Sequence, residues 1–433
     1  SIKDTGYDVD NSLRFNDGDS PVLSKTASGS GNRRTWTISW WFKRSTLGGM
    51  TFFWQDGAST DHETKIAFDS SNRLFIYDFD GASFNMLLKT NRNFRDISAW
   101  YHAIIAVDTT DGTAANRIKM YINGVQETSF ETATYPSQNH DTEWNTNNEL
   151  RIAKDSSGDY FDGYLTEIVN VDGTQLAQTS LGEFDSDSPN IWKPIELDLT
   201  FGTNGFYLDF EDSSALGNDV SGNNNDFSPS NLAATDQSTD TCTNNFATLN
   251  PLDVATSGTS TFAEGNLKMT TDKQSRTTFG ASSGKWYVEA KYVNNTAANG
   301  IAQMDGSNTF NTNSIILFGS SNGTISVSGS DTDTNVGAGT AIADNSIIMF
   351  AMDLDNNRLY LGKNGSWWTS GSGFVSSDLD SFKTITRVTG DTFGFKCSNY
   401  SGTGTTEWNF GSPPYAISSG NADGEGFGNF EYA

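Results

Sequence analysis

Residues Ala351 to Trp368 read Ala-Met-Asp-Leu-Asp-Asn-Asn-Arg-Leu-Tyr-Leu-Gly-Lys-Asn-Gly-Ser-Trp-Trp, and this stretch decides the fold class. Two short runs rich in apolar residues are separated by turns rich in Asn, Asp and Gly. Asn364-Gly365 is the strongest hairpin signal, because Asn and Gly tolerate the positive φ that a type I′ turn requires at both central positions. The pattern recurs at Arg117–Gln126 and at Ser71–Gly81. The sequence therefore predicts antiparallel strands joined by tight turns.

The composition agrees with an all-β protein of more than one domain. The chain has 433 residues, more than a single hydrophobic core usually serves. Charged residues make up only 18 %, aromatic residues make up 12 %, and there are 42 glycines, which favours turns and aromatic cores over long helices or disorder. Strand-sized segments fill residues 1–185 and 256–433, and 186–255 is rich in Asn, Asp, Ser and Thr. We predict two antiparallel β-sandwiches joined by a connecting segment, 186–255, that holds one or two strands.

Four segments carry more detailed predictions. Thr35–Lys43 begins with alternation and then becomes fully apolar, as expected of a strand buried on both faces. Phe206–Glu211 alternates apolar and polar residues, so its apolar side chains should share one buried face. Thr174–Leu181 is the one convincing short helix, and the glycine-rich, aromatic stretch Gly424–Tyr432 should loop back across the second sandwich.

The charge and the cysteines limit the function classes. The net charge of −26 excludes nucleic acid and anionic membranes as partners and fits a protein that stays soluble in saline surroundings. No run approaches the ~20 apolar residues of a membrane span, and no signal peptide is recognisable. Cys242 and Cys397 are too few for a disulfide scaffold, although one bridge between them stays open. Because the chain starts at Ser1 without Met, we expect processed ends or a segment of a longer protein.

Three motifs in the first half resemble the laminin G-like (concanavalin A-like) sandwich family. They occur in the family's order and look like its central strands: Ala99-Trp-Tyr-His102 leading into Ala106-Val-Asp108, Lys119-Met-Tyr-Ile-Asn-Gly124 and Phe161-Asp-Gly-Tyr-Leu-Thr-Glu-Ile168. The resemblance covers roughly residues 8–185. It implies a jelly-roll sandwich, and such domains often carry a calcium ion near their loops.

Motifs in the second half resemble the SPRY sandwich over about residues 260–415. They are Gly284-Lys-Trp-Tyr-Val-Glu289, Phe350-Ala-Met-Asp353, Leu361-Gly-Lys-Asn-Gly365 and Trp367. The tandem of two such domains, joined by a segment like Leu216–Phe227, looks like structural proteins of bacteriophages that infect marine bacteria. That likeness implies a place on a tail fibre or a head surface.

The candidate binding residues fall in turns. Asp219, Asn223, Asn225 and Asp226 form the densest group of oxygen ligands, so calcium is the most plausible ion, with a plain Asx-turn linker as the alternative. Asp78 and Asp80 are a weaker second choice. No other cofactor is required. Surface aromatic residues could stack on sugar rings, and four tryptophans in turn-like contexts are the candidates, with packing in a core or an interface as the alternative: Trp54, Trp144, Trp367 and Trp368.

No catalytic signature is present. Glu167 and Asp172 lie five positions apart, which places them on opposite faces of a strand, whereas Asp209 and Glu211 share a face and are the weak candidate for a hydrolytic pair. His62, His102 and His140 are far from both cysteines and lack the spacing of zinc ligands, and His102 should be a packed core residue.

Taken together, the sequence predicts a non-enzymatic virion protein that mediates adhesion or assembly. Its expected partners are other virion proteins, further copies of itself and a host-surface glycan or receptor, with no nucleic acid and no insertion into a membrane. The alternatives are a polysaccharide-degrading enzyme on the concanavalin A-like sandwich and a secreted bacterial adhesin.

Overall fold

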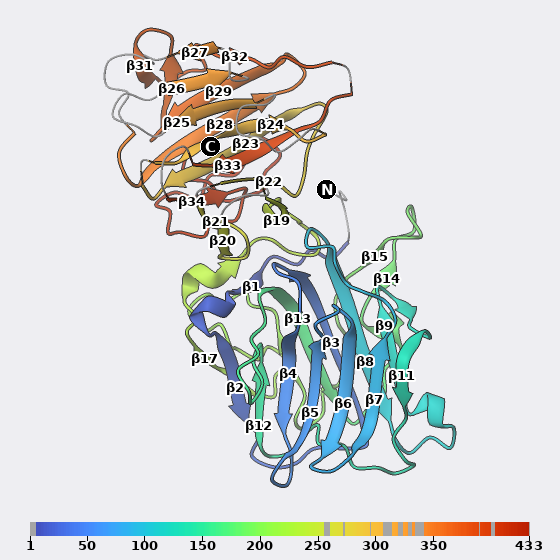
Figure 1. Cartoon of the computed structure of the whole chain (residues 1–433). Helices are drawn as coiled ribbons and strands as arrows, with labels where there is room; N and C mark the ends of the chain where they lie inside the picture. The colour runs from blue at the N-terminus through green and yellow to red at the C-terminus, as the bar shows by residue number, and fades with distance from the viewer. Residues whose placement is uncertain are drawn as a thin grey trace. The chain divides into compact units, whose positions relative to one another are not determined.

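The computed structural model describes residues 6–254, 260–271, 273–294, 296–305, 314–318, 324–327, 331–333, 342–388, 390–399 and 403–432. Strands dominate these residues, and the helical segments are short 3-10 turns (Figure 1): η1 Asp17–Asp19, η2 Ala114–Asn116, η3 Gln178–Ser180 and η4 Ala234–Asp236. The chain divides into two compact units, Ser1–Asn245 and Phe246–Ala433. We call them unit 1 and unit 2.

Unit 1 is a sandwich of two antiparallel sheets (Figure 1). The β3 sheet has the order β10 (Val125–Gln126), β9 (Ile118–Ile122), β8 (Trp100–Asp108), β3 (Thr35–Arg44), β13 (Gly163–Asp172), β1 (Ser12–Phe15) and β18 (Gln237–Ser238), and β16 (Phe206–Leu208) also pairs with β13. The β5 sheet has the order β11 (Phe130–Thr134), β7 (Phe84–Thr90), β6 (Leu74–Asp80), β5 (His62–Phe68), β4 (Met50–Asp56), β12 (Glu149–Ile152), β2 (Val22–Thr26) and β17 (Ser228–Ser230). A small hairpin pairs β14 (Glu183–Phe184) with β15 (Trp192–Lys193).

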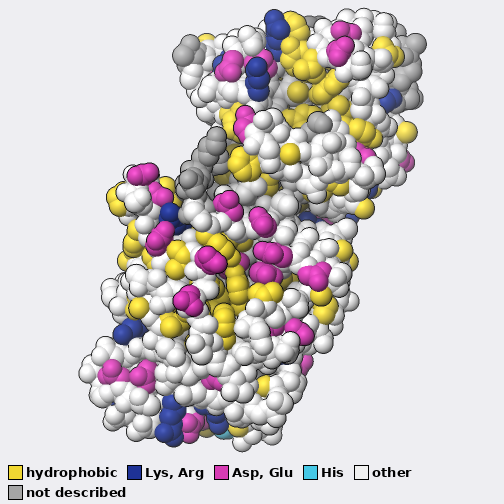
Figure 2. Space-filling model, turned by 180° about the vertical axis from the view of Figure 1, so that it is seen from behind, with side chains coloured by type: hydrophobic (Ala, Val, Ile, Leu, Met, Phe, Trp, Pro, Cys, Tyr) yellow, Lys and Arg dark blue, Asp and Glu magenta, His cyan; other side chains and the backbone are white. Residues whose placement is uncertain are grey.

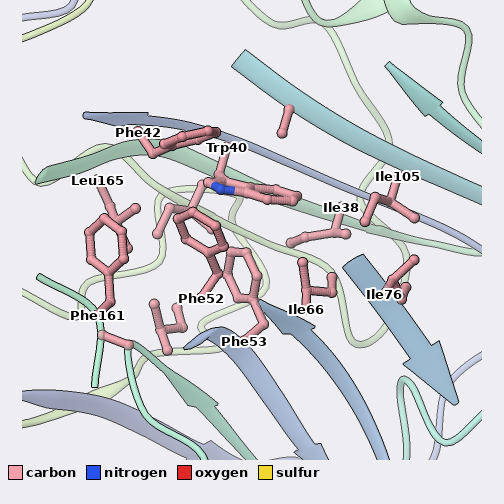
Figure 3. Close-up of a cluster of buried hydrophobic side chains, with 14 of the residues drawn as sticks. Ile38, Trp40, Phe42, Phe52, Phe53, Ile66, Ile76, Ile105, Phe161 and Leu165 are labelled. Carbon is pink, nitrogen blue, oxygen red and sulfur yellow. The ribbon is translucent and has the colours of Figure 1, made fainter. Parts of the chain in front are cut away.

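The core of unit 1 lies between these sheets and is aromatic. The Trp40 ring lies 5.3 Å from the ring of Phe52 and 5.1 Å from that of Phe53, measured between centroids. Figure 3 shows Ile38 of β3 and Ile66 of β5 facing one another beside these rings. Truncating one large buried side chain of this kind to Ala typically costs about 3–5 kcal/mol, so the aromatic core is the main source of stability in this unit.

The outer face of the β3 sheet is buried as well, because residues 173–201 lie across it. Strands β3 and β13 are buried on both faces, as predicted for Thr35–Lys43. One cluster on this outer face joins Ile104 and Val169 to Leu197, Leu199 and Phe201, and a second consists of Trp41, Trp100, Tyr164 and Trp192.

The structure therefore assigns most of the predicted connecting segment to unit 1. Strands β16, β17 and β18 pair with β13, β2 and β1, and Phe206, Leu208 and Phe210 lie in the core, facing inward as predicted. Composition alone suggested a linker at 186–255, but the polar residues there form turns between buried positions. Of the predicted helix Thr174–Leu181, only the 3-10 turn η3 is present.

The predicted hairpins have the expected turn geometry. Asn364 and Gly365 have φ angles of 48° and 82°, and Asn123 and Gly124 have 48° and 74°. Both pairs form two-residue loops, because Lys363 pairs with Ser366 and Ile122 with Val125. Gly124 is fixed by packing too, since a Cβ atom there would lie 2.1 Å from the indole of Trp192.

Unit 2 is a second antiparallel sandwich. The β24 sheet has the order β19 (Leu249–Val254), β22 (Gln274–Thr277), β33 (Phe393–Ser398), β24 (Ala298–Gln303), β25 (Ser314–Phe318), β26 (Thr324–Val327) and β27 (Asp331–Asp333). The β28 sheet has the order β20 (Ser260–Ala263), β21 (Lys268–Thr271), β34 (Gly404–Asn409), β23 (Lys285–Tyr292), β28 (Ser346–Asp353), β29 (Arg358–Lys363), β30 (Ser366–Thr369) and β31 (Gly373–Ser376), with β32 (Lys383–Thr384) on β29. The core between these sheets includes Val288, Phe350, Leu361 and Trp408.

Candidate functional site

The outer face of the β28 sheet presents a row of aromatic residues. Tyr287 on β23 pairs with Ala351 on β28, and Ala351 pairs with Tyr360 on β29. Directly opposite residues of an antiparallel sheet share one face. Their chain neighbours Val288 and Phe350 point into the core, so these three residues point away from it, and each is partly exposed.

Two more rings border this row. Phe382 meets Tyr360 edge to face at a centroid distance of 5.8 Å, and Trp367 meets Tyr287 edge to face at 6.5 Å. We call Tyr287, Tyr360, Trp367 and Phe382, with Ala351 between them, the aromatic face. Tyr287 and Tyr360 lie two strands apart, roughly 10 Å. Ala351 is the small, partly exposed residue between these two rings.

Charged groups follow the aromatic face at one end. Lys285, Asp353 and Arg358 form the neighbouring row on the same side of the sheet. The guanidinium of Arg358 lies 4.3 Å from the ring centroid of Phe382 and donates a hydrogen bond of 3.3 Å to the Tyr360 hydroxyl. Flat apolar rings beside hydrogen-bonding groups can hold a ligand that has both an apolar face and a rim of hydroxyl groups.

The C-terminal segment Gly424–Tyr432 covers the other end. The buried Glu289 carboxylate accepts hydrogen bonds from the backbone N–H groups of Glu431 and Tyr432, at 3.0 and 2.7 Å. Phe430 packs edge to face on Tyr287 at 5.1 Å. The predicted return of this stretch across the second sandwich is confirmed, and it fixes the orientation of Tyr287.

Three of the four predicted sugar-stacking tryptophans are packed away. Trp144 has no exposed surface, stacks on Trp36 at 5.2 Å and donates from its indole to Asn170 at 3.0 Å. Trp54 and Trp368 are only 6 % and 4 % exposed. The prediction of surface rings at these positions is wrong, because turn-like neighbours in sequence do not exclude a place in the core. Trp367 is partly exposed and belongs to the aromatic face.

The predicted calcium ligands do meet in one loop, but as a hydrogen-bond network. Asp219 Oδ1 accepts from the N–H groups of Tyr207 and Ser221, and Oδ2 accepts from the N–H of Asn225 and the Ser221 hydroxyl, all at 2.8–2.9 Å. These four donors fill the carboxylate. The side-chain amide groups of Asn223 and Asn225 donate to backbone carbonyls, and Asp226 Oδ1 accepts from the N–H of Asp219.

A lysine supplies positive charge beside this loop. The Lys25 ammonium lies 4.9 and 5.4 Å from the ring centroids of Phe206 and Phe227, and no hydrogen-bond partner is present for its buried nitrogen in the described structure. Burial lowers the Lys25 pKa to about 8, against the attraction of nearby carboxylates such as Asp219. The loop residues therefore do not fit a calcium site well, because their carboxylate is saturated and a cation is already close.

The second candidate pair, Asp78 and Asp80, is also occupied by protein donors. Asp78 accepts from the Thr64 hydroxyl and the backbone N–H of Glu143, and His140 Nε2 lies 2.8 Å from it. The Asn85 amide and turn N–H groups lower the Asp80 pKa to about 2. No group of three or more His, Cys, Asp or Glu side chains able to hold a metal ion occurs within the described ranges.

Glu167 on β13 lies near the carboxylates of Asp209 and Glu211, which follow β16, and its spacing in the sequence did not predict this. Glu167 lies at a bulge of β13 with a φ of 49°, and its Oε2 accepts a 2.6 Å hydrogen bond from the Tyr207 hydroxyl. Burial, together with the nearby charges of Asp209 and Glu211, raises the Glu167 pKa to about 7. In the sequence, Glu167 was considered as a partner of Asp172 alone, so its place at a bulge beside Tyr207 and near Asp209 was not predicted.

His102 and the two cysteines, which could also have carried chemistry, form no reactive group in this structure. His102 is 1 % exposed, as expected of a core residue. Cys242 and Cys397 are both free thiols, so the bridge that the sequence left open is absent.

Comparisons with known proteins agree with this fold. Residues 16–175 match the profile of the concanavalin A-like lectin/glucanases superfamily. Curated proteins show no significant match to the chain. No helix in the described part of the chain is long and apolar enough to cross a membrane.

Several solved structures are similar at low sequence identity. The heptameric SAP-like pentraxin of Limulus polyphemus is 14 % identical, with a TM-score of 0.29 over 40 % of this chain and 81 % of the pentraxin. The SPRY domain of human HERC1 is 12 % identical, with a TM-score of 0.28 over 37 % of this chain and 96 % of that domain. Domain 4 of the Geobacillus stearothermophilus arabinanase AbnA, in complex with arabinotriose, is 17 % identical, with a TM-score of 0.26 over 34 % of this chain and 65 % of that chain.

Proposed function

We propose that this protein is a non-enzymatic structural protein on the surface of a bacteriophage particle, in a tail fibre, an appendage or a head decoration, and that it binds a host-surface glycan or receptor. The strongly acidic composition and two rigid sandwiches suit an exposed adhesion module. The profile match over residues 16–175 includes lectins in its description, which supports the carbohydrate part of the proposal.

The aromatic face carries the glycan proposal. It combines partly exposed tyrosine and tryptophan rings, the small side chain of Ala351 between them and the charged side chains of Arg358 and Asp353. A pyranose ring offers an apolar face of C–H groups and a rim of hydroxyls, so it fits rings beside hydrogen-bonding groups. Hydrophobic side chains gather on the surface of unit 2 in the space-filling view, whereas acidic side chains are prominent on unit 1 (Figure 2).

A glycan array tests this proposal. The chain should bind a restricted set of glycans, and Tyr360→Ala or Trp367→Ala should weaken that binding about tenfold, which is the effect of losing roughly 1.4 kcal/mol of stacking. Trp286→Ala is the matched control, because Trp286 is 49 % exposed on the same strand as Tyr287 but alternates to the other side. Absence of binding, or an equal loss in the control, would reject the aromatic face as the glycan site.

The location is tested on particles. Antibodies against the chain should label purified virions by electron microscopy in a regular, symmetric pattern, since virion appendages and head lattices repeat their subunits. Recovery of the chain only from bacterial culture supernatant would instead favour the secreted adhesin.

One observation favours the enzyme alternative. A carboxyl group with a pKa of about 7, such as Glu167, can act as a general acid at neutral pH, and Asp209 is a nearby second carboxyl. Polysaccharide turnover that Glu167→Gln abolishes would replace the adhesion proposal. We prefer adhesion because Glu167 is only 6 % exposed and its Oε2 is shared by the hydroxyl groups of Tyr207 and Tyr7.

A further inference from the structure

Three reactive side chains from distant parts of the sequence converge in unit 1. Lys43 lies near the end of β3, and Asp240 and Asn245 follow β18. The Lys43 Nζ lies 2.7 Å from Asp240 Oδ2 and 2.7 Å from Asn245 Oδ1. The Lys43 and Asp240 side chains are only 1 % and 2 % exposed. An amine, a carboxyl group and a carboxamide therefore meet at hydrogen-bonding distance.

Aromatic rings enclose this group. The indole of Trp100 donates to Asp240 Oδ1 at 2.9 Å, and the Tyr164 ring centroid lies 5.7 Å from the Lys43 nitrogen. Both rings belong to the cluster on the outer face of the β3 sheet. Apolar walls of this kind disfavour a separated ion pair and make a neutral amine beside a neutral acid comparatively less costly.

The carboxamide is held beside the amine by hydrogen bonds at both of its ends. The Asn245 side-chain N–H donates to the Ser98 carbonyl at 2.8 Å while its oxygen faces the Lys43 amine, so the amide plane is held at both ends. Asn245 itself is exposed, which leaves a route to solvent for a small leaving group. An ion pair between Lys43 and Asp240 alone would not require a carboxamide fixed in this way.

We propose that Lys43 and Asn245 form an intramolecular isopeptide bond, with Asp240 as the proton carrier. The Lys43 ammonium first gives a proton to the Asp240 carboxylate. The neutral amine then attacks Cγ of Asn245, and the bond from Cγ to Nδ2 breaks. The departing nitrogen takes the proton of Asp240 and the surplus proton of the attacking amine, so it leaves as ammonium. The products are a Lys43–Asn245 amide and an ammonium ion, and Asp240 regains its charge. No oxidant, metal or other reactant is needed.

The bond would change how unit 1 bears load. It would close a loop of about two hundred residues, because its ends are 202 positions apart in the sequence. Asn245 is the last residue of unit 1, so a pull on the chain beyond it would reach β3 directly through the amide. The residues between Lys43 and Asn245 would be bypassed. This property suits a protein under tension but does not depend on the adhesion proposal.

Intact-mass spectrometry of the full-length chain tests the proposal. The folded protein should be lighter than its sequence mass by one ammonia molecule. Trypsin should leave the bond after Lys43 uncut, and Thr35–Arg44 should appear joined to the peptide Asp155–Lys268. The full sequence mass after long storage, or loss of water with a link from Lys43 to Asp240, would overturn the proposal.

Variants separate chemistry from folding. Asn245→Ala should keep the full mass expected for its sequence and should fold, because the residue is exposed. Asp240→Asn should also stay unlinked, with near-ultraviolet circular dichroism reporting whether it has folded. The adjacent Asn244→Ala is the matched control and should still lose one ammonia. Loss of ammonia in folded Asn245→Ala would show that the bond forms elsewhere and would overturn the assignment.

Discussion

His102 shows how a residue that often carries chemistry can serve packing alone. Its ring lies between Trp41 and Trp192, at centroid distances of 4.5 and 6.1 Å. The Trp192 indole N–H can only donate a hydrogen bond, so His102 Nδ1 must be the acceptor. The hydrogen of the neutral ring therefore lies on Nε2, which donates it to Ser39 Oγ at 2.7 Å. A charged ring would turn a second N–H toward the indole donor. Burial lowers the His102 pKa to about 3.

Unit 1 should therefore lose stability in acid. The folded-state pKa of about 3 lies below the unfolded value of 6.5, so the unfolded chain binds the proton first. The contribution of neutral His102 is complete above pH 6.5 and is lost as the pH falls toward 3, by up to roughly 5 kcal/mol in total. Urea unfolding at a series of pH values measures this loss. His102→Gln should make the stability less dependent on pH, whereas the control His62→Gln should not. An equal effect of both substitutions would contradict the assignment of the acid sensitivity to His102.

Among the elements, the Asp219 loop is a self-contained network rather than a cation cage. Asp219→Ala removes the acceptor of four donors and also removes the strongest electrostatic attraction on Lys25, so we expect unit 1 to lose about 2–4 kcal/mol of stability. Denaturant titration measures the loss. Asp212→Ala is the control, since Asp212 accepts hydrogen bonds only within an exposed turn and its loss should change stability far less. If calcium raised the melting temperature of the wild-type protein and a chelator reversed the rise, the loop would be a calcium site and this interpretation would be wrong.

The C-terminal segment should depend on one carboxylate. Glu289 accepts from Tyr287, Asn409, Glu431 and Tyr432, and Glu289→Gln turns one of these acceptor positions into a donor. We expect the last residues to detach and become sensitive to protease, with unit 2 about 2–3 kcal/mol less stable. Limited proteolysis followed by mass spectrometry locates the cut. Glu407→Gln, which only loses ion pairs to Lys268 and Lys291, should keep the segment protected.

Local features of these elements could be predicted from the sequence, and long-range ones could not. The turns at Asn123-Gly124 and Asn364-Gly365 followed from two adjacent residues, so their geometry was predictable. The burial of Trp144 depends on a stacking partner more than a hundred positions earlier in the chain. The aromatic face likewise depends on strand register, because Tyr287 and Tyr360 become neighbours only when β23 and β29 both flank β28. The sequence shows the alternation of residues within each strand, but it does not show which strands pair.

The same limit applies to the whole molecule. The sequence predicts two sandwiches, but the polar composition of residues 186–255 conceals strands that complete the first. The meeting of Lys43 with Asp240 and Asn245 joins positions about two hundred residues apart, and no spacing rule predicts such a contact. Composition describes the average environment of a segment, whereas the sites of this protein depend on single buried residues within polar segments.

The boundary between the units can be tested with fragments. Residues 1–245 should fold alone, because the core of unit 1 and all the strands of its sheets lie within that range. Residues 1–185 should not fold, since this fragment lacks five buried core side chains: Phe206, Leu208, Phe210, Leu216 and Phe227. Each such loss costs about 3–5 kcal/mol for Phe and about 2–5 kcal/mol for Leu, so together they match or exceed the roughly 5–15 kcal/mol by which a domain is usually stable. Near-ultraviolet circular dichroism and thermal unfolding measure the outcome. Equal, cooperative unfolding of both fragments would return the boundary to residue 185 and make the following strands an accessory layer.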